Sequence, residues 1–379
     1  MRERSSLSGG GLHIGIAGAG VLGRLLAWRL SQAGHVVSVF DPAPGPQAPP
    51  TGRLAPAGQG HAAGFTAAGM LSPLAELENA GPQIARLGWR SLSLWRAVCE
   101  QLRLQGADSP LFAQRGSLMV AHRSDLGAAQ RVLARLAEAP ALARELPTPE
   151  ALDAEALARL EPVLAPQLQA WLLPGEAQLM PRELLAALCT QAPLVRWHWN
   201  TAASAVNPGA LTLHDGVQVK VDLAIDVRGV AARPALPVRG VRGEVLWLHA
   251  PGVALQRPVR LLHPRHRVYL VPRPGDLIVV GASEIESEDR SPVSLRSAVE
   301  LMAAAHSVIP ELAEARVVHM ESNLRPALPD NHPLIHHEHG LLRINGLFRH
   351  GWLLAPALVE DALAQLAATN SPHPHALPA

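Results

Sequence analysis

The feature that most constrains the fold of this chain is a glycine-rich turn that joins an apolar segment to a helix-forming one. Residues 14–17 (IGIA) are typical of a buried strand, and GAGVLG at 18–23 matches the pattern GxGxxG. Helix-compatible residues continue to Ala33, and a second apolar run, Val36 to Phe40, ends at Asp41. A strand, turn, helix, strand and acid at these spacings predict the first unit of a Rossmann-type nucleotide-binding domain.

Each part of this motif can contact one part of a dinucleotide. Gly18 permits a tight turn, Gly20 lets a pyrophosphate approach the backbone, and Gly23 lets the helix pack closely on the strand. The helix N-terminus offers free N–H groups to phosphates, and the Asp41 carboxylate can accept hydrogen bonds from a ribose. The predicted contacts of the turn also include Ala19, Val21 and Leu22. The motif alone leaves FAD and NAD as alternatives.

Composition narrows the class of protein. The 379 residues are 48% hydrophobic and 17% charged, which suffices for two packed domains. The net charge of +1 gives no electrostatic footprint for nucleic acid. Cys99 and Cys189 are too few for a disulfide framework and are expected to be buried small hydrophobes. With neither a signal-peptide pattern nor an uncharged apolar run long enough to span a bilayer, we expect a soluble, cytoplasmic protein without stable membrane insertion.

Hydrophobic periodicity and turn residues predict further elements along the chain. Helical segments are expected at 74–102, 125–160 (broken by prolines), 181–189 and 291–306. Strands are expected at 115–121, 194–199 and 219–226, and an antiparallel sheet with one face open to a ligand at 243–249, 267–271 and 277–281. The last quarter returns to a nucleotide-domain pattern, with a strand at 341–345, a turn at 346–351 and a helix at 352–368.

Other segments carry little chemistry. Residues 42–60 are rich in proline and glycine and predict a loop, and the ends, 1–10 and 371–379, predict loose tails. The chain has a single lysine, Lys220, at a predicted hairpin edge, which is a poor candidate for a pyridoxal Schiff base. His336, His337, Glu338 and His339 could hold a metal, but a solvated turn is the simpler interpretation, and we predict no metal site.

Cationic residues and glycine turns gather near the C-terminus. Arg325 lies in LRP, and Arg349 lies in GLFRHGW, a turn that leads into the last predicted helix. Arginine can bind a carboxylate in bidentate fashion, and a helix N-terminus can stabilise the negative charge of a reduced flavin. No nucleophile paired with a base is evident. Surface loop arginines remain the alternative for either residue taken alone.

Taken together, the motifs resemble the D-amino-acid oxidase superfamily of FAD enzymes, and most of all the glycine oxidases of thiamin (thiazole) biosynthesis. The resemblance favours FAD, bound non-covalently, over NAD. The matching stretches extend almost end to end: IAGAGVLG with Asp41, AAGMLSPLAE at 67–76, LEPVLAP and PGEAQLMPREL at 160–184, DVRGVAAR at 226–233, VRGEVLW at 241–247, YLVPR and VVGASE at 269–284, and LRPALPDNHPLI and GLFRHGWLLAP at 324–356.

The resemblance implies an α/β fold, α+β as a whole, in which a Rossmann-type FAD-binding domain interleaves with an antiparallel-sheet substrate domain. The FAD-binding domain would comprise residues 11–80, 183–235 and 320–370, and the substrate domain residues 81–182 and 236–319. Arg325 and Tyr269 would bind the substrate carboxylate, and Arg349 would line the substrate side. Further FAD contacts would come from Ala68, Gly69, Met70, Arg228, Gly229, His350, Gly351, Trp352 and Leu353.

The chain departs from the family pattern at several positions. Asp41 stands in place of the usual Glu, and Met180 in place of an acid. Asn323 stands where Gly usually precedes LRP. Near the flavin edge, Leu347 replaces His and His350 replaces Asn. These last two changes leave the substrate and the reactivity with oxygen open.

The resemblance implies oxidation of glycine or a small amino acid by hydride transfer to flavin N5, without a side-chain base. The imine would hydrolyse to a 2-oxo acid and ammonia, with hydrogen peroxide as co-product. A D-amino-acid dehydrogenase that reduces a quinone and a flavin-binding subunit without turnover are the alternatives. A covalent sarcosine oxidase and a tRNA-modifying domain fit less well, because no cysteine follows Cys189 and the charge is near neutral. The resemblance suggests a homo-oligomer, whose order the sequence leaves open.

Overall fold

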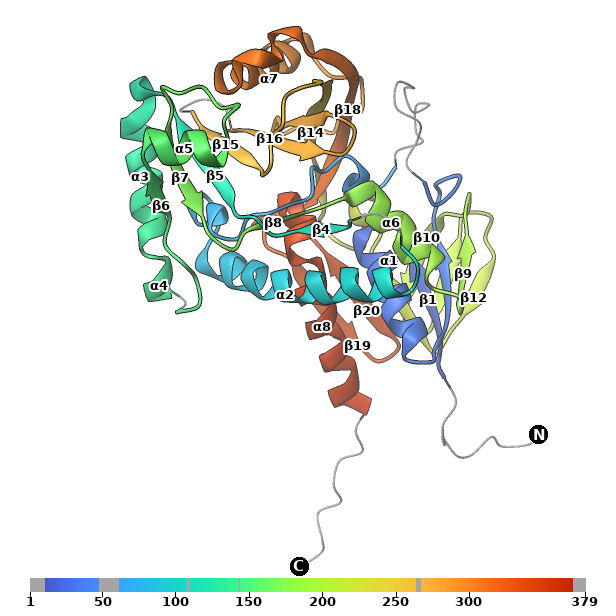
Figure 1. Cartoon of the computed structure of the whole chain (residues 1–379). Helices are drawn as coiled ribbons and strands as arrows, with labels where there is room; N and C mark the ends of the chain where they lie inside the picture. The colour runs from blue at the N-terminus through green and yellow to red at the C-terminus, as the bar shows by residue number, and fades with distance from the viewer. Residues whose placement is uncertain (1–10, 48–60, 108–109, 143, 264–266, 371–379) are drawn as a thin grey trace, which may run out of the picture.

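A computed structural model describes residues 11–47, 61–107, 110–142, 144–263 and 267–370 (Figure 1). The predicted tails, 1–10 and 371–379, and positions 48–60 of the predicted loop lie outside the described residues. Within the described part, no helix has the length and apolar character of a membrane span. Cys99 and Cys189 are buried and unpaired, as predicted, and burial raises their thiol pKa to about 12 and about 11.

The predicted Rossmann unit is confirmed at the N-terminus. Strand β1 (His13–Ala17) leads through the glycine turn into α1 (Val21–Gln32), and β2 (Val36–Phe40) pairs parallel to β1. These strands belong to a six-stranded sheet of order β19-β20-β13-β1-β2-β9. The other members are β9 (Val195–His198), β13 (Leu223–Asp226), β19 (Leu334–Glu338) and β20 (Leu341–Asn345).

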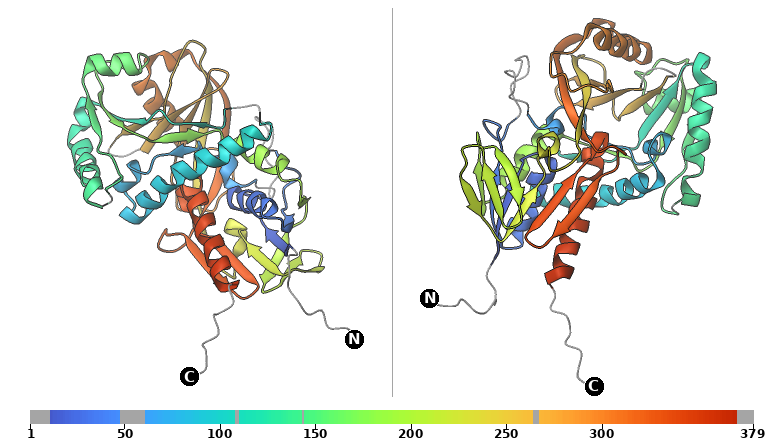
Figure 2. Two further views of the ribbon diagram at one scale, coloured as in Figure 1. Left: turned by 60° about the horizontal axis from the view of Figure 1, so that its bottom comes forward. Right: turned by 180° about the vertical axis from the view of Figure 1, so that it is seen from behind.

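The two faces of this sheet are covered by different structures (Figure 2). Helices α1, α2 (Pro82–Leu104), α6 (Pro181–Thr190) and α8 (Gly351–Asn370) share one hydrophobic core with Ile14, Ile16 and Ile225 of the sheet. A three-stranded meander of β10 (Ala203–Asn207), β11 (Ala210–Leu213) and β12 (Gln218–Lys220) packs on the opposite face through Ala17 and Ala224. This alternation of side chains between two cores is the period-2 pattern of a sheet covered on both faces.

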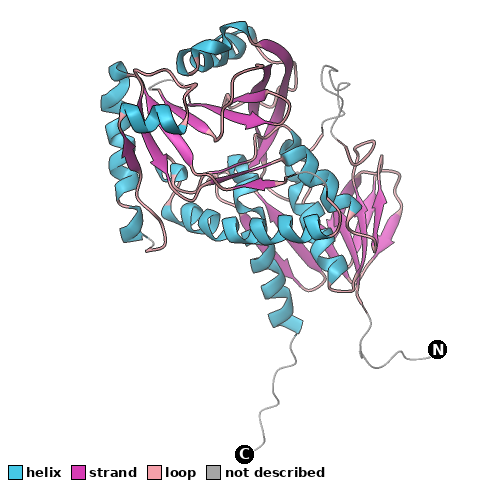
Figure 3. Cartoon of the chain, viewed as in Figure 1, coloured by secondary structure: helices cyan, strands magenta, loops and turns pink. Residues whose placement is uncertain are grey.

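A second, eight-stranded sheet has the order β18-β14-β17-β16-β15-β5-β7-β6 (Figure 3). Its strands are β5 (Ser117–Ala121), β6 (Glu150–Leu152), β7 (Gln169–Leu173), β14 (Arg239–His249), β15 (Val259–Leu262), β16 (Arg267–Arg273), β17 (Leu277–Gly281) and β18 (Arg316–Ala327). All its pairings are antiparallel except β15 with β5. Helices α7 (Leu295–Val308) and α5 (Ala154–Leu160) cover one face. On the opposite face, residues 126–137 and 75–78 pack against β5, β7 and the end of β15, and residues of β14 and β16 line the site.

Shorter elements join the two sheets. Strands β3 (Met70–Leu71), β8 (Ala177–Leu179) and β4 (Phe112–Ala113) form a small antiparallel sheet. Helices α3 (Leu126–Ala137) and α4 (Ala139–Leu142) lie at the outer end of the large sheet. The short 3-10 segments are η1 (Ala63–Phe65), η2 (Ala75–Glu78), η3 (Arg123–Asp125), η4 (Gly229–Ala232), η5 (Pro310–Glu314) and η6 (Phe348–His350).

Several sequence predictions are corrected by the structure. The helix expected at 74–102 is η2 followed by α2, which begins at Pro82, because proline favours the first position of a helix. The helical region at 125–160 contains a strand, β6, and the strand expected at 219–226 is split between β12 and β13. Residues 336–338 lie in the edge strand β19 and not in a turn, because β20 pairs with them.

The predicted division of the chain into two domains stays a prediction. The elements do form two main cores, one under each large sheet. However, α2 shares the core of α8, and β18 continues without a break through position 320. The two parts therefore interleave more closely than ranges of sequence can express.

Candidate active site

A single cavity of about 1550 Å³ extends from the glycine turn after β1 to the open face of the eight-stranded sheet. Gly18 and Gly20 line one end, and Tyr269 and Arg325 line the other. The two sheets thus supply the two ends of one site.

The glycine turn has the geometry that the motif predicts. Gly18 has φ +104°, and a Cβ there would lie 2.7 Å from the carbonyl oxygen of Val227. A Cβ at Gly23 would overlap the carbonyl oxygen of Gly18, so α1 can approach the turn only with glycine there. No side chain caps the first turn of α1, which leaves its N–H groups free toward the cavity.

Asp41 lies at the end of β2 and lines the cavity. Its Oδ2 accepts a hydrogen bond from the backbone N–H of Ala19 at 2.6 Å, and its Oδ1 accepts one from Ala43 at 2.8 Å. These bonds fix the carboxylate beside the glycine turn and leave lone pairs for a ribose diol. The contact of Asp41 with a ribose stays a prediction.

The segment at 68–70 crosses the middle of the cavity as it enters β3. Arg273 of β16 donates hydrogen bonds to the carbonyl oxygen of Ala68 and to Oε1 of Gln178. Burial lowers the pKa of the Arg273 guanidinium to about 10. Arg273 thus connects the segment expected along a flavin ring to the large sheet, a contact that the sequence motif YLVPR did not by itself reveal.

The second glycine turn, at 227–229, also lines the cavity, but the Arg228 side chain has a structural partner. Its Nη2 donates to Oδ2 of the buried Asp226 at 2.8 Å, and its Nε donates to Oδ1 at 2.9 Å. Its Nη1 donates to the carbonyl oxygens of Ala203 and Ser204. The turn therefore offers backbone to a cofactor, while the guanidinium holds the meander against β13.

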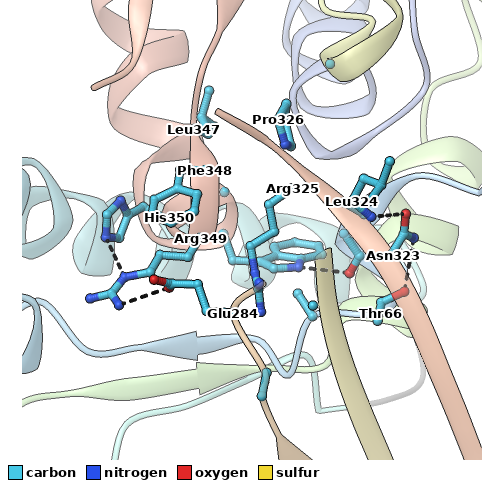
Figure 4. Close-up of a pocket in the computed structure, with 18 of the residues that line it drawn as sticks. Thr66, Glu284, Asn323, Leu324, Arg325, Pro326, Leu347, Phe348, Arg349 and His350 are labelled. Atoms are coloured by element: carbon cyan, nitrogen blue, oxygen red, sulfur yellow. Dashed lines mark hydrogen bonds and ion pairs between the residues drawn. The ribbon is translucent and has the colours of Figure 1, made fainter. Parts of the chain in front are cut away.

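At the other end of the cavity, Arg325 of β18 lies among the lining residues (Figure 4). Tyr269 of β16 also lines the cavity. A Cβ at Gly243 would overlap the Arg325 guanidinium, and a Cβ at Gly281 would lie 2.6 Å from the Tyr269 hydroxyl. Two glycines on neighbouring strands thus make room for the two predicted substrate-binding side chains. This arrangement supports both assignments and adds Gly243 and Gly281 to the site.

Arg325 is held by the backbone and not by a carboxylate. Its Nη2 donates to the carbonyl oxygen of Ser283 at 3.0 Å, and its Nη1 donates to that of Arg242 at 3.3 Å. Among the described residues, no carboxylate forms an ion pair with it. Burial lowers its pKa, while nearby Tyr269 and Glu284 favour the charged form. A partly buried cation without a paired anion is suited to an anionic ligand.

Arg349 has a different environment. Its Nη2 pairs with Oε2 of Glu76 at 2.6 Å, and its Nη1 lies 3.6 Å from Oε2 of Glu284. His350 Nε2 lies 2.9 Å from the same Glu76 oxygen, and Arg260 Nη2 lies 3.7 Å from Glu76 Oε1. We call Glu76, Arg260, Arg349 and His350 the Glu76 cluster. Burial would raise the pKa of Glu76, but His350 and Arg349 hold it well below its ordinary value.

The predicted turn and helix at the C-terminal end are confirmed. The 3-10 segment η6 leads directly into α8, so the helix begins beside the cavity with Gly351, Trp352 and Leu353 in its lining. Trp352 Nε1 donates to the carbonyl oxygen of Gly64 at 3.0 Å, and Trp95 Nε1 donates to that of Trp352 at 2.6 Å. These bonds fix the helix N-terminus, the partly positive end that can stabilise an anionic flavin.

Sequence reasoning missed several residues of the site: Glu76, Gly243, Arg260, Gly281 and Glu284. Four of them, Glu76, Gly243, Gly281 and Glu284, lie inside the family-like motifs AAGMLSPLAE, VRGEVLW and VVGASE. Their presence in these motifs as glycines or acids was the signal that could have identified them. Arg260 lies in no motif, and only the pairing of β15 with β16 brings it to the cavity. No group of three metal-ligating side chains occurs among the described residues, which includes His336 to His339.

The cavity fits FAD in the kinds of group that it presents. The free N–H groups of α1 and the Asp41 carboxylate lie at one end, and the N-terminus of α8 and the uncompensated Arg325 lie at the other. Fold and site together define a flavin-dependent oxidoreductase with a second binding region for a small anion.

Comparison with known proteins identifies the family. The sequence profile described as FAD dependent oxidoreductase, of the D-amino-acid oxidase (DAO) type, matches residues 13–366, and the chain belongs to this family. It is 37% identical over 361 residues to a Rhizobium etli protein assigned as the thiamine biosynthesis oxidoreductase ThiO, covering 94% of this chain and 96% of the relative. The identity to the glycine oxidase of Geobacillus kaustophilus is 26% over 372 residues, covering 90% and 89% of the two chains.

Solved structures agree with the fold. The crystal structure of the Geobacillus kaustophilus glycine oxidase superposes with a TM-score of 0.80 at 25% identity, covering 96% of each chain. The iminodiacetate oxidase of a Chelativorans species superposes with a TM-score of 0.78 at 25% identity, covering 97% of each chain. The predicted cofactor, FAD, and the predicted fold class are confirmed.

Proposed function

We propose that this chain catalyses the FAD-dependent oxidation of glycine or another small amino acid, as part of thiamine biosynthesis. The observation that carries the proposal is the pair Arg325 and Tyr269, seated on Gly243 and Gly281 at the end of the cavity opposite the nucleotide-binding turn. The Arg325 guanidinium has no carboxylate partner in the described structure. Together with the neighbouring Tyr269 hydroxyl, it can bind one carboxylate of a substrate. The relatives named for thiamine biosynthesis and glycine oxidation support the same reaction.

In this proposal the protein acts mainly by binding and orientation. Arg325 and Tyr269 hold the substrate carboxylate, which fixes the direction of the α-carbon and its hydrogen. Their partial burial strengthens the charged hydrogen bond, which contributes roughly 1.5–3 kcal/mol. Bound FAD supplies the acceptor for the hydride that leaves the α-carbon. The imine product then reacts with water to give a 2-oxo acid and ammonia.

Two features of the chain support the electrostatics of this reaction. The N-terminus of α8 presents positive partial charge at the cavity, where negative charge develops on reduction. Glu76 neutralises much of the charge of Arg349, so that Arg325 is the cation left for the substrate. The predicted substrate-lining role of Arg349 is therefore indirect in this proposal: it positions Glu76 and the η6 turn.

Product analysis tests the proposed function. The FAD-loaded protein is incubated in air with glycine, sarcosine and D-alanine, and the 2-oxo acid, the released amine (ammonia from glycine and D-alanine, methylamine from sarcosine) and hydrogen peroxide are each quantified. Equal amounts of the three products from one of these amines would support the oxidase. Flavin reduction that requires an added quinone for turnover would instead indicate a dehydrogenase. Absence of all three products with every amine and every acceptor would contradict the proposal.

A further inference from the structure

We infer that the site contains a second anion-binding position, built on Arg260, and that it favours amino acids that carry a second carboxylate on the amine nitrogen or on the side chain. The inference rests on the proposed amino-acid oxidation for the identity of the ligand as an amine. It goes further by naming the substrate class that the site selects over glycine.

Arg260 lies next to Tyr269 on the open face of the large sheet. The two residues are direct partners in the antiparallel pairing of β15 with β16, so their side chains project from the same face. Tyr269 in turn pairs with Gly281 on β17. Because neighbouring strands lie about 4.8 Å apart, the backbone of Arg260 is roughly 10 Å from that of Gly281. Tyr269 thus separates two arginines, Arg325 on one side and Arg260 on the other.

The guanidinium of Arg260 is partly buried and poorly satisfied. Its side chain is 12% exposed, and its Nε is fully buried without a hydrogen-bond partner in the described structure. Its one ion pair is long, 3.7 Å from Nη2 to Oε1 of Glu76. By contrast, Arg349 and His350 contact the other oxygen of that carboxylate at 2.6 and 2.9 Å. Glu76 therefore interacts mainly with Arg349 and His350, and Arg260 keeps N–H donors that are available to a ligand in the cavity.

The nearby Glu176 compensates Arg260 only in part. Its carboxylate accepts hydrogen bonds from the backbone N–H groups of Leu74 and Ala75 and from the hydroxyl of Ser117. Burial raises the pKa of Glu176 to about 7, so a substantial fraction is protonated at neutral pH. Arg260 therefore lacks a fully ionised carboxylate partner at short distance. A carboxylate of a ligand would stabilise its guanidinium by accepting two parallel hydrogen bonds from it.

The charges at this end of the cavity agree with a dicarboxylic ligand. Arg349 is paired with Glu76 at 2.6 Å, whereas Arg325 has no carboxylate partner among the described residues and Arg260 has only its 3.7 Å contact with Glu76. A glycine zwitterion has one carboxylate and can pair with only one of these two guanidiniums. An amino acid with two carboxylates can pair with both. The α-carboxylate would bind Arg325 and the second carboxylate Arg260.

Unreactive ligands provide the test. Acetate, malonate and succinate are titrated into the FAD-loaded protein under anaerobic conditions, and their dissociation constants are measured from the change in the flavin absorption band. The same titrations are done with Arg260→Gln, which keeps a polar side chain without charge. Arg131→Gln serves as the control, because Arg131 of α3 lines the same cavity and its substitution removes the same charge.

We expect the wild-type protein to bind malonate or succinate at least tenfold more tightly than acetate. Arg260→Gln should abolish that preference and leave the acetate affinity within about twofold, while Arg131→Gln should retain the preference. Equal affinities for mono- and dicarboxylates in the wild-type protein would overturn the inference. This comparison needs no variant, so it remains valid even if Arg260→Gln does not fold. An equal loss for both ligand types in Arg260→Gln would also overturn it.

Substrate measurements separate this inference from the proposed function. Iminodiacetate and D-aspartate are compared with glycine and sarcosine for flavin reduction. Faster reduction at low concentration by the dicarboxylic amines supports both proposals. If no amine reduces the flavin but dicarboxylates still bind through Arg260, the second anion position stands and the proposed oxidation fails. If glycine reduces the flavin and no dicarboxylate preference exists, the oxidation stands and the second position fails.

Discussion

Replacement of Gly243 by alanine isolates the contribution of the Arg325 position, because the substitution leaves Arg325 itself in the chain. The added Cβ would overlap the guanidinium, with Nη1 only 2.6 Å away. It would force Arg325 away from the carbonyl oxygens of Ser283 and Arg242 that hold it at 3.0 and 3.3 Å. The arginine would then no longer be held where the substrate carboxylate binds.

The size of the effect follows from the bond that is lost. A hydrogen bond to a charged group contributes about 1.5–3 kcal/mol, which corresponds to a loss of affinity of roughly 10- to 150-fold at about 1.4 kcal/mol per factor of ten. The affinity for FAD should not change, because Gly243 lies at the opposite end of the cavity from Gly18 and Asp41.

The assay measures the dissociation constant of acetate from the flavin band, together with the FAD content of the purified protein. Gly127→Ala is the control, since position 127 lies in α3 where an added Cβ meets no atom within 4 Å. A Gly243→Ala protein that keeps its FAD and binds acetate as tightly as Gly127→Ala would refute the reasoning.

Three further predictions concern the cofactor and the buried carboxyls. Asp41→Ala should weaken FAD binding at least several-fold, as equilibrium dialysis against FAD would measure, because it removes the acceptor fixed by Ala19 and Ala43; unchanged FAD affinity would exclude a ribose contact. Glu76 has a lowered pKa in the fold, so its contribution to stability is present above the ordinary carboxyl pKa and is lost as the pH falls below it; Glu76→Gln should reduce this acid dependence in thermal unfolding curves. Glu176 has a pKa raised to about 7, so the folded state retains a proton that the unfolded state releases, and stability should fall as the pH rises toward 7. Glu176→Gln should flatten that part of the curve, and a slope that stays the same would assign the effect to another group.

The nucleotide-binding half of the fold could be predicted from the sequence because its signals are local. Val36 to Phe40, the glycine turn and the helix between them are contiguous, and each carries its own pattern of apolar residues and glycines. The same holds for the last strand and helix. In each case, propensity, periodicity and turn residues all favour one structure.

The large sheet was predicted less completely, because its pairing is non-local. Strand β18 contains Pro326, exposed valines and several charges, and such a segment does not match the pattern of an inner strand. It is tolerated at the edge of the sheet, where proline needs no ladder partner on the open side. Similarly, β6 and β19 are short strands whose identity depends on their partners β7 and β20.

The residues of the site also divide into those that local motifs predict and those that depend on non-local contacts. Motifs mark Arg325, Tyr269 and Asp41, and all three line the cavity, while their contacts with substrate and cofactor stay predictions. Arg260 could not be found in this way, since its place beside Tyr269 is a consequence of strand register. The pairing of Glu76 with Arg349 and His350 joins residues more than 270 positions apart, and no spacing rule predicts such a contact.

Anaerobic reduction of the flavin tests the central claim most directly. The FAD-loaded wild-type protein and Arg325→Ala are mixed in a stopped-flow instrument with increasing concentrations of glycine, sarcosine, D-alanine or iminodiacetate, and bleaching of the flavin band is followed. We predict that at least one amine bleaches the wild-type flavin with saturable kinetics, and that Arg325→Ala raises the half-saturating concentration at least tenfold and slows reduction. A wild-type flavin that no amine bleaches, or identical kinetics in the two proteins, would contradict the account.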